Sequence, residues 1–172
     1  PKEMLPVLDK PIIQYIVEAA VSAGMTDVIL VTGPTKRAIE DHFDASPELE
    51  AMLAVKGKKA VASEIKKISQ LANFVYIRQK GPYGNGTPVL NAAGVIGDEP
   101  FAVVYGDDIW LTPDGKPHLS QLLETFYHYG DPVITALPVT AEMTKHYGVI
   151  DGTKIEKDVY QVKRIVEKPG PK

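Results

Sequence analysis

The feature that most constrains the fold of this chain is an alternation of helix-period stripes with short, continuous apolar runs. Residues 11–23 carry apolar side chains at helical spacing, and Gly24 provides a stop. Residues 28–31 then form an uninterrupted apolar run, as expected of a parallel strand that is buried on both faces. The two patterns repeat in this order, which predicts an α/β fold with a largely parallel sheet.

Further elements follow from the same patterns. Helices are expected over residues 35–43, over 47–71 with an interruption near Gly57, over 89–95 and over 119–126. Strands are expected over 74–77, 101–105 and 133–139, with short β-segments around 149–150, 154–155 and 162–166. On helix 35–43, Lys36/Glu40 and Arg37/Asp41 are spaced four residues apart and are expected to face outward as ion pairs.

Length, charge and cysteine content limit the functional classes. The chain of 172 residues fits a single domain over residues 1–172. Nineteen basic and 22 acidic side chains leave a net charge of −3, which argues against a large surface for nucleic acid or an anionic membrane. No apolar run approaches the roughly 18 residues that span a bilayer. The chain has no cysteine, which removes thiol chemistry and fits a reducing, cytoplasmic compartment.

The strongest local signal for chemistry is the apolar run 101–105 followed by Gly106, Asp107 and Asp108. Ligands of open α/β folds bind at the carboxyl ends of the strands, so these acids are expected at the rim of a binding crevice. Carboxylates are the oxygen ligands that Mg²⁺ prefers, together with water and substrate phosphates. An acidic turn in which an aspartate caps the next element fits the same residues.

Two other strand ends carry candidate groups. The loop from Gln79 to Thr87 is rich in glycine and follows a strand, so its backbone and the Gln79 amide could meet a base edge or a phosphate. It matches neither standard phosphate-loop pattern. Glu167 and Lys168 end the last strand, where a lysine can hold a phosphate and a glutamate can accept sugar hydroxyls. An exposed ion pair before a proline explains them equally well.

The order of these signals resembles that of the bacterial UTP–glucose-1-phosphate uridylyltransferase family, also called UDP-glucose pyrophosphorylases. The motifs that carry the resemblance span nearly the whole chain in family order. They are Pro1–Pro6, Asp9–Tyr15, Val31–Gly33, Lys36–Asp44, Tyr76–Lys80, Gly97–Val103, Gly106–Asp108, His146–Ile150 and Val166–Pro169.

The resemblance implies a Rossmann-like nucleotidyltransferase fold, a three-layer α/β/α arrangement with a mixed, mostly parallel sheet. It also implies a Mg²⁺-dependent reaction in which UTP and α-D-glucose 1-phosphate form UDP-glucose and pyrophosphate. By the same resemblance, Asp107 is a Mg²⁺ ligand with Asp108 beside it, and Lys2 meets phosphates. Gln79 and Gly84 are the readers of uracil.

The remaining implied roles concern the sugar. Gly148 is expected to offer a backbone contact, Glu167 to accept sugar hydroxyls, and Lys168 to hold the sugar-side phosphate. The resemblance also implies homo-oligomers for the full-length form.

The chain departs from the family pattern in ways that limit the expected activity. Family members have a Gly-x-Gly-Thr-Arg loop and a first strand ahead of the motif at residues 1–6, and they continue beyond the motif at 166–169. Thr87–Pro88 replaces the usual His-Ala. We therefore expect a partial domain that is catalytically poor as an isolated chain, with an unpaired sheet edge that favours association.

Two alternatives belong to other classes. A non-catalytic module that binds or senses a sugar nucleotide would use the same residues without turnover. A receiver-like signalling domain also presents acids and a lysine on an α/β sheet. That fold needs its acids early in the chain, whereas Asp107 and Asp108 lie well past the middle.

Overall fold

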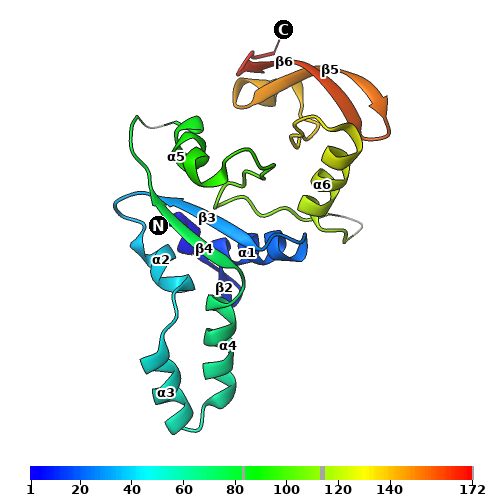
Figure 1. Cartoon of the computed structure of the whole chain (residues 1–172). Coiled ribbons are helices and arrows are strands. Elements are labelled where there is room, and N and C mark those ends of the chain that lie inside the picture. The colour runs from blue at the N-terminus through cyan, green and yellow to red at the C-terminus, as the bar shows by residue number, and fades with distance from the viewer. Residues whose placement is uncertain (83, 113–114, 172) are drawn as a thin grey trace. The chain divides into compact units, whose positions relative to one another are not determined.

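The computed structural model describes residues 1–82, 84–112 and 115–171, and Figure 1 shows the course of the chain. Contacts along the backbone divide it into two compact units, unit 1 (residues 1–124) and unit 2 (residues 125–172).

Unit 1 contains most of the secondary structure. Its elements in chain order are η1 (Lys2–Met4), β1 (Pro6–Val7), β2 (Lys10–Pro11), α1 (Ile12–Ser22), β3 (Asp27–Thr32), α2 (Arg37–Phe43), α3 (Pro47–Val55), α4 (Lys59–Ser69), β4 (Asn73–Arg78) and α5 (Gly86–Ile96). Helix α6 (His118–Tyr129) begins in unit 1 and ends in unit 2. Each predicted helix is present, and α5 begins three residues earlier than the predicted start at residue 89.

Strands β3 and β4 form a parallel pair in register from Asp27 opposite Asn73 to Thr32 opposite Arg78. Both strands were predicted from their continuous apolar runs. The chain crosses from one to the other through α2, α3 and α4, as a parallel connection requires. Their shared carboxyl edge brings the residues after Thr32 and Arg78 to one end of the unit.

The core of unit 1 lies where α1 and α2 pack against this pair of strands. Ile13 and Val17 of α1 meet Ile39 and Phe43 of α2, and all four side chains are buried. The Phe43 ring stacks on Phe74 of β4 with 4.7 Å between ring centroids. Because apolar positions recur with helical period in both helices, each presents one continuous face to the strands.

Helices α3 and α4 form a hairpin that extends from the strand pair in Figure 1. The break between them comes at Gly57, whose φ of +73° favours glycine. This confirms the predicted interruption. No residue of either helix is buried, so the hairpin adds little to the core.

Two predicted strands do not form. Residues 101–105 and 133–139 have the apolar sequence of a strand, but neither segment pairs with another strand in the described chain. Phe101 and Val103 are consequently about half exposed, at 55% and 53%. An apolar run shows that a segment suits a buried strand, whereas the strand itself needs a neighbouring backbone to pair with. The parallel sheet among the described residues is therefore the β3–β4 pair alone.

Unit 2 is built on a long antiparallel hairpin of β5 (Gly148–Glu156) and β6 (Val159–Glu167), preceded by η2 (Ala141–Lys145). The sequence predicted several short β-segments here, and they join into these two strands. Register shifts after Asp151 and Lys154 explain the interrupted pattern. At the first shift, a Cβ on Gly152 would lie 2.5 Å from the carbonyl oxygen of Gln161, so only glycine fits.

Candidate functional site

The first cluster of predicted site residues in unit 1 joins Lys2 to Asp107. These residues lie 105 positions apart, and Lys2 Nζ donates to Asp107 Oδ2 at 2.5 Å. Both side chains reach solvent, with 64% and 35% of their areas exposed. The hydrogen bond from Asp107, together with its negative charge, raises the pKa of Lys2. The structure thus brings a fixed cation and a carboxylate to one exposed point of unit 1.

A buried residue that sequence reasoning did not single out, Glu3, follows Lys2 in the chain and lies against Gly106. Its Oε1 accepts a 2.5 Å hydrogen bond from Lys36 Nζ, and only 7% of its side chain is exposed. Its Oε2 is buried without a hydrogen-bond partner in the described chain. A Cβ on Gly106 would lie 3.1 Å from Glu3 Cγ and 3.3 Å from Ile13 Cδ1, so the turn at Asp107 packs closely against these two side chains.

The outward ion pairs predicted on α2 are half right. Arg37 and Asp41 form the expected pair at 3.5 Å. Lys36, however, bonds Glu3, and Glu40 accepts from Arg78 at 3.1 Å. Lys36 precedes the first turn of α2 rather than lying on its face, so Glu3 of η1 binds Lys36, and Arg78 at the end of β4 binds Glu40.

The acids are arranged in a way that suits a loosely held divalent cation. Asp108 N donates to Tyr105 O at 3.2 Å, so a turn carries Asp107 at its tip with Asp108 next to it. Among the described residues, no three His, Asp or Glu side chains gather into a group that could hold a metal by themselves. Mg²⁺ commonly uses one or two protein carboxylates and takes its other ligands from water and phosphates. Asp107 fits that kind of site.

The second cluster in unit 1 is the loop after β4. Gln79 N donates to Thr32 O at 2.9 Å, which continues the strand ladder by one residue. Asn91 of α5 then clasps the loop, since its side chain accepts from Lys80 N at 2.5 Å and donates to Lys80 O at 3.2 Å. Gln79 is partly exposed and Gly84 is exposed. In the part of unit 1 that the structure describes, no hydrogen bond or ion pair joins Gln79 or Gly84 to Lys2 or Asp107.

The third cluster belongs to unit 2 and unites the residues predicted to meet the sugar. Gly148 and Glu167 are direct partners in the β5–β6 ladder. A Cβ on Gly148 would lie 3.1 Å from Glu167 Oε2, so the glycine leaves room for that carboxylate. Lys168 Nζ lies 3.3 Å from Glu167 Oε1, and its backbone N donates to Tyr147 O at 3.2 Å. Lys168 has a φ of +46°, an uncommon conformation for a residue other than glycine.

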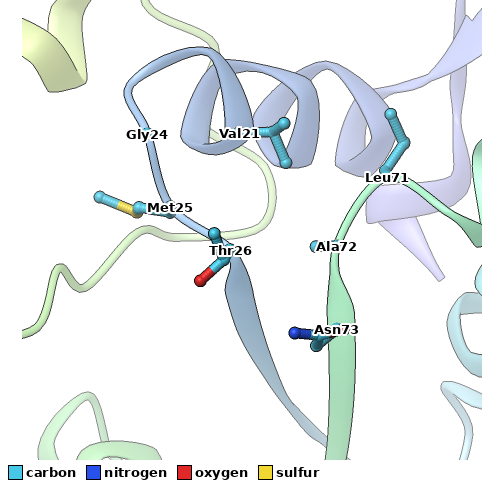
Figure 2. Close-up of a pocket in the computed structure, with 7 residues that line it drawn as sticks. All are labelled: Val21, Gly24, Met25, Thr26, Leu71, Ala72 and Asn73. Atoms are coloured by element: carbon cyan, nitrogen blue, oxygen red, sulfur yellow. The ribbon is translucent and has the colours of Figure 1, made fainter.

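Two surface hollows lie away from these clusters. Figure 2 shows the first, at the amino ends of β3 and β4, which is lined by Thr26, Asn73 and mainly apolar residues of α1, the α1–β3 turn and the α4–β4 turn. It is at the edge opposite Gln79. The second, in unit 2, includes Val149 and Val166. Since successive strand residues point to opposite faces, it lies across the hairpin from Gly148 and Glu167.

The described helices include none that is both long and apolar enough to cross a bilayer.

With this geometry in place, the comparisons with known proteins identify the class. A sequence profile of the Nucleotidyl transferase family matches residues 1–172, and the chain belongs to that family.

Its relatives within the family are more specific. The chain is 53% identical over 169 residues to UTP–glucose-1-phosphate uridylyltransferase of Bacillus subtilis strain 168, and 49% identical over 171 residues to YngB, a UTP–glucose-1-phosphate uridylyltransferase of the same strain. These alignments cover 98% and 99% of this chain, and 57% of each relative. The chain therefore spans just over half the length of the curated relatives it matches. The resemblance inferred from the motifs is confirmed.

Solved structures agree. UTP-bound UGPase from Acinetobacter baumannii superposes with a TM-score of 0.91 at 34% identity, over 98% of this chain and 60% of that one. UDP-glucose pyrophosphorylase in complex with UDP-glucose gives 0.83 at 39% identity, over 99% and 62%. These likenesses confirm an α/β nucleotidyl transferase fold.

Proposed function

We propose that this chain forms part of a uridylyltransferase that makes UDP-glucose and pyrophosphate from UTP and α-D-glucose 1-phosphate. A phosphate oxygen of the sugar substrate attacks the α-phosphorus of UTP, and the bond from that phosphorus to the bridging oxygen breaks as pyrophosphate leaves. Catalysis of this kind is mainly positioning and charge neutralisation. Support comes from relatives at 49–53% identity that carry this activity in their names.

The observation that carries the proposal is the contact between Lys2 and Asp107 at 2.5 Å. An exposed ammonium and an exposed carboxylate held together suit a triphosphate accompanied by Mg²⁺, because each group can exchange its partner for the ligand. Lys2 would neutralise phosphate oxygens, and Asp107 would hold the metal with Asp108 beside it. Bound Mg²⁺ would supply charge neutralisation on the phosphates.

Gln79 and Gly84 are proposed to select the base. Gln79 has a backbone fixed to Thr32 and a partly exposed side chain with both a donor and an acceptor. Such a group can match the imide edge of uracil, which also has both. Gly84 is exposed in the same loop and leaves its backbone open to a base.

Unit 2 is proposed to hold the glucose 1-phosphate portion. Gly148 would give a backbone contact, and Glu167 would accept sugar hydroxyls. Lys168, which already neutralises Glu167 at 3.3 Å, would hold the phosphate next to the sugar. A carboxylate and an ammonium that touch each other suit a ligand with hydroxyls next to a phosphate.

The finer points of assembly belong to the same proposal. We infer a Rossmann-like, three-layer sheet fold for the whole protein, a single domain that includes residues 1–172, a cytoplasmic location and a homo-oligomer. We also expect low turnover from the 172 residues by themselves, because they span only 57% of the length of the relatives they match.

Calorimetric titration of UTP and UDP-glucose, with and without Mg²⁺, tests the proposal alongside a pyrophosphate-release assay. We expect both compounds to bind, and Mg²⁺ to strengthen UTP binding about tenfold through Asp107. Asp107→Asn should lose that gain. Asp41→Asn, which changes an exposed carboxylate paired with Arg37, should keep it.

The outcomes separate the parts of the proposal. Binding without turnover supports the site and the expected low activity. Rapid pyrophosphate release that Asp107→Asn abolishes supports the site but refutes the low activity. No binding of either compound, or equal behaviour of Asp107→Asn and the parent chain, contradicts the proposed function.

A further inference from the structure

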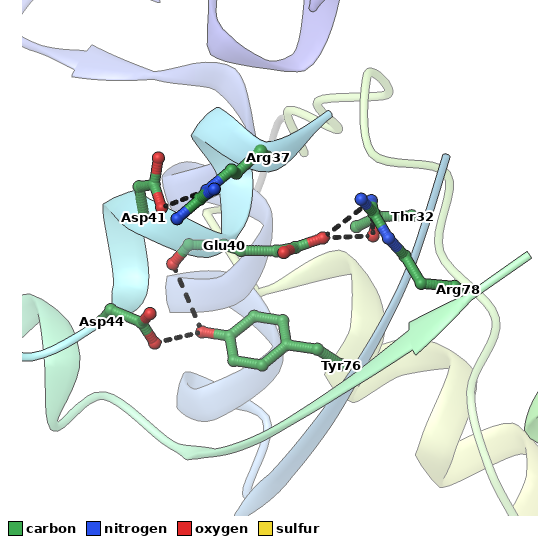
Figure 3. A network of polar contacts seen from close by, with 7 residues as sticks. All are labelled: Thr32, Arg37, Glu40, Asp41, Asp44, Tyr76 and Arg78. Atoms are coloured by element: carbon green, nitrogen blue, oxygen red, sulfur yellow. Dashed lines mark hydrogen bonds and ion pairs between the residues drawn. The ribbon is translucent and has the colours of Figure 1, made fainter. Parts of the chain in front are cut away.

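A polar network ties the carboxyl ends of β3 and β4 to helix α2. Thr32, only 3% exposed, donates from Oγ1 to Glu40 Oε1 at 2.6 Å. Arg78 Nη1 donates to the same Glu40 oxygen at 3.1 Å, and to the carbonyl oxygen of Gly33 at 2.6 Å. Figure 3 shows the three side chains converging from two strands and a helix. We call Thr32, Glu40 and Arg78 the strand-end network.

The network adjoins Gln79 through the backbone. Thr32 uses its hydroxyl for Glu40 and its carbonyl oxygen for Gln79 N, at 2.6 and 2.9 Å. Arg78 is the residue before Gln79 and the last residue of β4. The residue before Gln79 in the chain and its hydrogen-bond partner across the ladder are therefore both members of the network, whereas the residue after it, Lys80, is held by Asn91.

A second contact fixes the same strand to the other end of α2. The Tyr76 hydroxyl donates to Asp44 Oδ1 at 3.4 Å, and it lies 3.5 Å from the carbonyl oxygen of Glu40. Burial, followed by the negative charge of Asp44, raises the pKa of Tyr76 to about 12, so the phenol remains a donor at neutral pH. Strand β4 is thus held to α2 at Tyr76 and at Arg78, immediately before the loop.

The helix also provides an internal contrast. Asp41 is next to Glu40 and also pairs with an arginine, but Arg37 and Asp41 are 80% and 62% exposed. Glu40 is only 23% exposed and accepts from a buried hydroxyl as well as from Arg78. Exposed pairs contribute little, whereas a partly buried carboxylate with several donors fixes geometry.

We propose that the strand-end network is a positioning element that sets Gln79 for selecting the base of the nucleotide. This inference rests on the proposed role of Gln79 as a reader of uracil. Thr32, Glu40 and Arg78 act through Gln79 and need not touch the ligand. Without the network, the end of β4 that carries Gln79 would be held less firmly to α2, and the Gln79 side chain would accept the donor and acceptor pattern of other pyrimidines.

Two measurements test the proposal in the full 172-residue chain. Hydrogen exchange at the Gln79 amide reports on the positioning itself and needs no ligand. The ratio of UTP to CTP affinity reports on the consequence, since the two bases differ in the donor and acceptor pattern at one edge. A loss of general stability would weaken both nucleotides equally and would leave their ratio unchanged.

Matched variants make the test specific. Thr32→Val removes the hydroxyl at nearly constant shape, and Thr32→Ser restores it. Glu40→Gln removes the charge, and Asp41→Asn does the same at the exposed neighbour. We expect Thr32→Val and Glu40→Gln to speed exchange at Gln79 about tenfold and to lower the UTP-to-CTP ratio about fivefold. Thr32→Ser and Asp41→Asn should leave both within about twofold.

Exchange at Gln79 and the UTP-to-CTP ratio decide the positioning role separately from the proposed function. Unchanged exchange at Gln79 in Glu40→Gln overturns the positioning role, and so does an unchanged ratio of affinities. If the parent chain binds neither nucleotide, the proposed function fails, and the exchange of Gln79 in the same variants still decides whether the network positions it. Glu40→Gln provides this readout even if Thr32→Val does not fold.

Discussion

The two units of the chain are stabilised in different ways. Unit 1 contains every buried apolar side chain of the described residues, including Val17 and Phe43 at 2% exposure. None of the described residues of unit 2 is buried, and Tyr160 and Ile165 of β6 are 54% and 60% exposed. A hairpin without a packed face is marginal by itself. Unit 1 therefore has a core of its own, whereas unit 2 depends mainly on backbone hydrogen bonds.

The difference matters for the proposed chemistry. In unit 1, the candidate residues lie close to buried ones, since Gly106, next to Asp107, approaches Glu3 and Ile13, and the carbonyl oxygen of Thr32 holds Gln79 N. In unit 2, Gly148, Glu167 and Lys168 are fixed by the β-ladder and the bond from Lys168 N to Tyr147 O. The sugar-side residues are therefore expected to be the more easily disturbed.

The largest test of this contrast is Phe43→Ala. The ring is buried and stacks on Phe74 at 4.7 Å, so its loss should lower the free energy of unfolding by about 3–5 kcal/mol. Tyr160→Ala removes an equally large ring from the exposed face of β6 and should cost less than about 1 kcal/mol. Urea unfolding followed by circular dichroism measures both. Equal losses would show that unit 2 has a core that its exposure does not reveal.

A buried charge sharpens the contrast at low pH. Burial alone would raise the pKa of Glu3, but the hydrogen bond and charge of Lys36, the bond to its own backbone amide and the charge of Lys2 lower it below its ordinary value. The folded carboxyl thus binds its proton less readily than the unfolded one. Its stabilising contribution is complete above about pH 5 and is lost as the pH falls through the lowered pKa.

Glu3→Gln should therefore reduce stability at pH 7 by about 2 kcal/mol and flatten its decline below about pH 5. The matched change in unit 2 is Asp151→Asn, which removes an exposed carboxylate 2.9 Å from Arg164. That variant should follow the parent chain within about 0.5 kcal/mol at every pH. Chemical unfolding from pH 3 to 7 gives the comparison. A decline as steep in Glu3→Gln as in the parent would assign the acid sensitivity to other carboxyls.

Sequence patterns predicted the parts of the fold that depend on local period. Helix α1, strand β3 and strand β4 each have an apolar pattern that needs no knowledge of a distant neighbour. Residues 101–105 were wrong as a strand because a strand also needs a paired backbone, which no local pattern reports. For the same reason, the hairpin of unit 2 was predicted only in fragments.

The candidate site divides in the same manner. The residues carried over from family motifs could be named in advance, and the structure brings Lys2 to Asp107 and Gly148 to Glu167. Glu3 was missed as a buried residue because its partner Lys36 lies 33 residues away. The strand-end network could have been anticipated from Thr32, which ends the apolar run of β3. A polar side chain buried at that position needs a hydrogen-bond partner.

A small expected effect on stability at Lys168 separates folding from function in unit 2. Its φ of +46° is costly for a side chain with a Cβ and free for glycine. Lys168→Gly should therefore change the free energy of unfolding by less than about 1 kcal/mol, with relief of strain offset by the greater freedom of glycine when unfolded.

The affinity of Lys168→Gly for UDP-glucose should nevertheless fall about tenfold or more if Lys168 holds the phosphate. Lys154→Gly offers no such relief, since Lys154 is paired with Tyr160 in the β5–β6 ladder, and should destabilise unit 2 without a selective loss of affinity. An unchanged affinity of Lys168→Gly for UDP-glucose would contradict the proposed phosphate contact of Lys168.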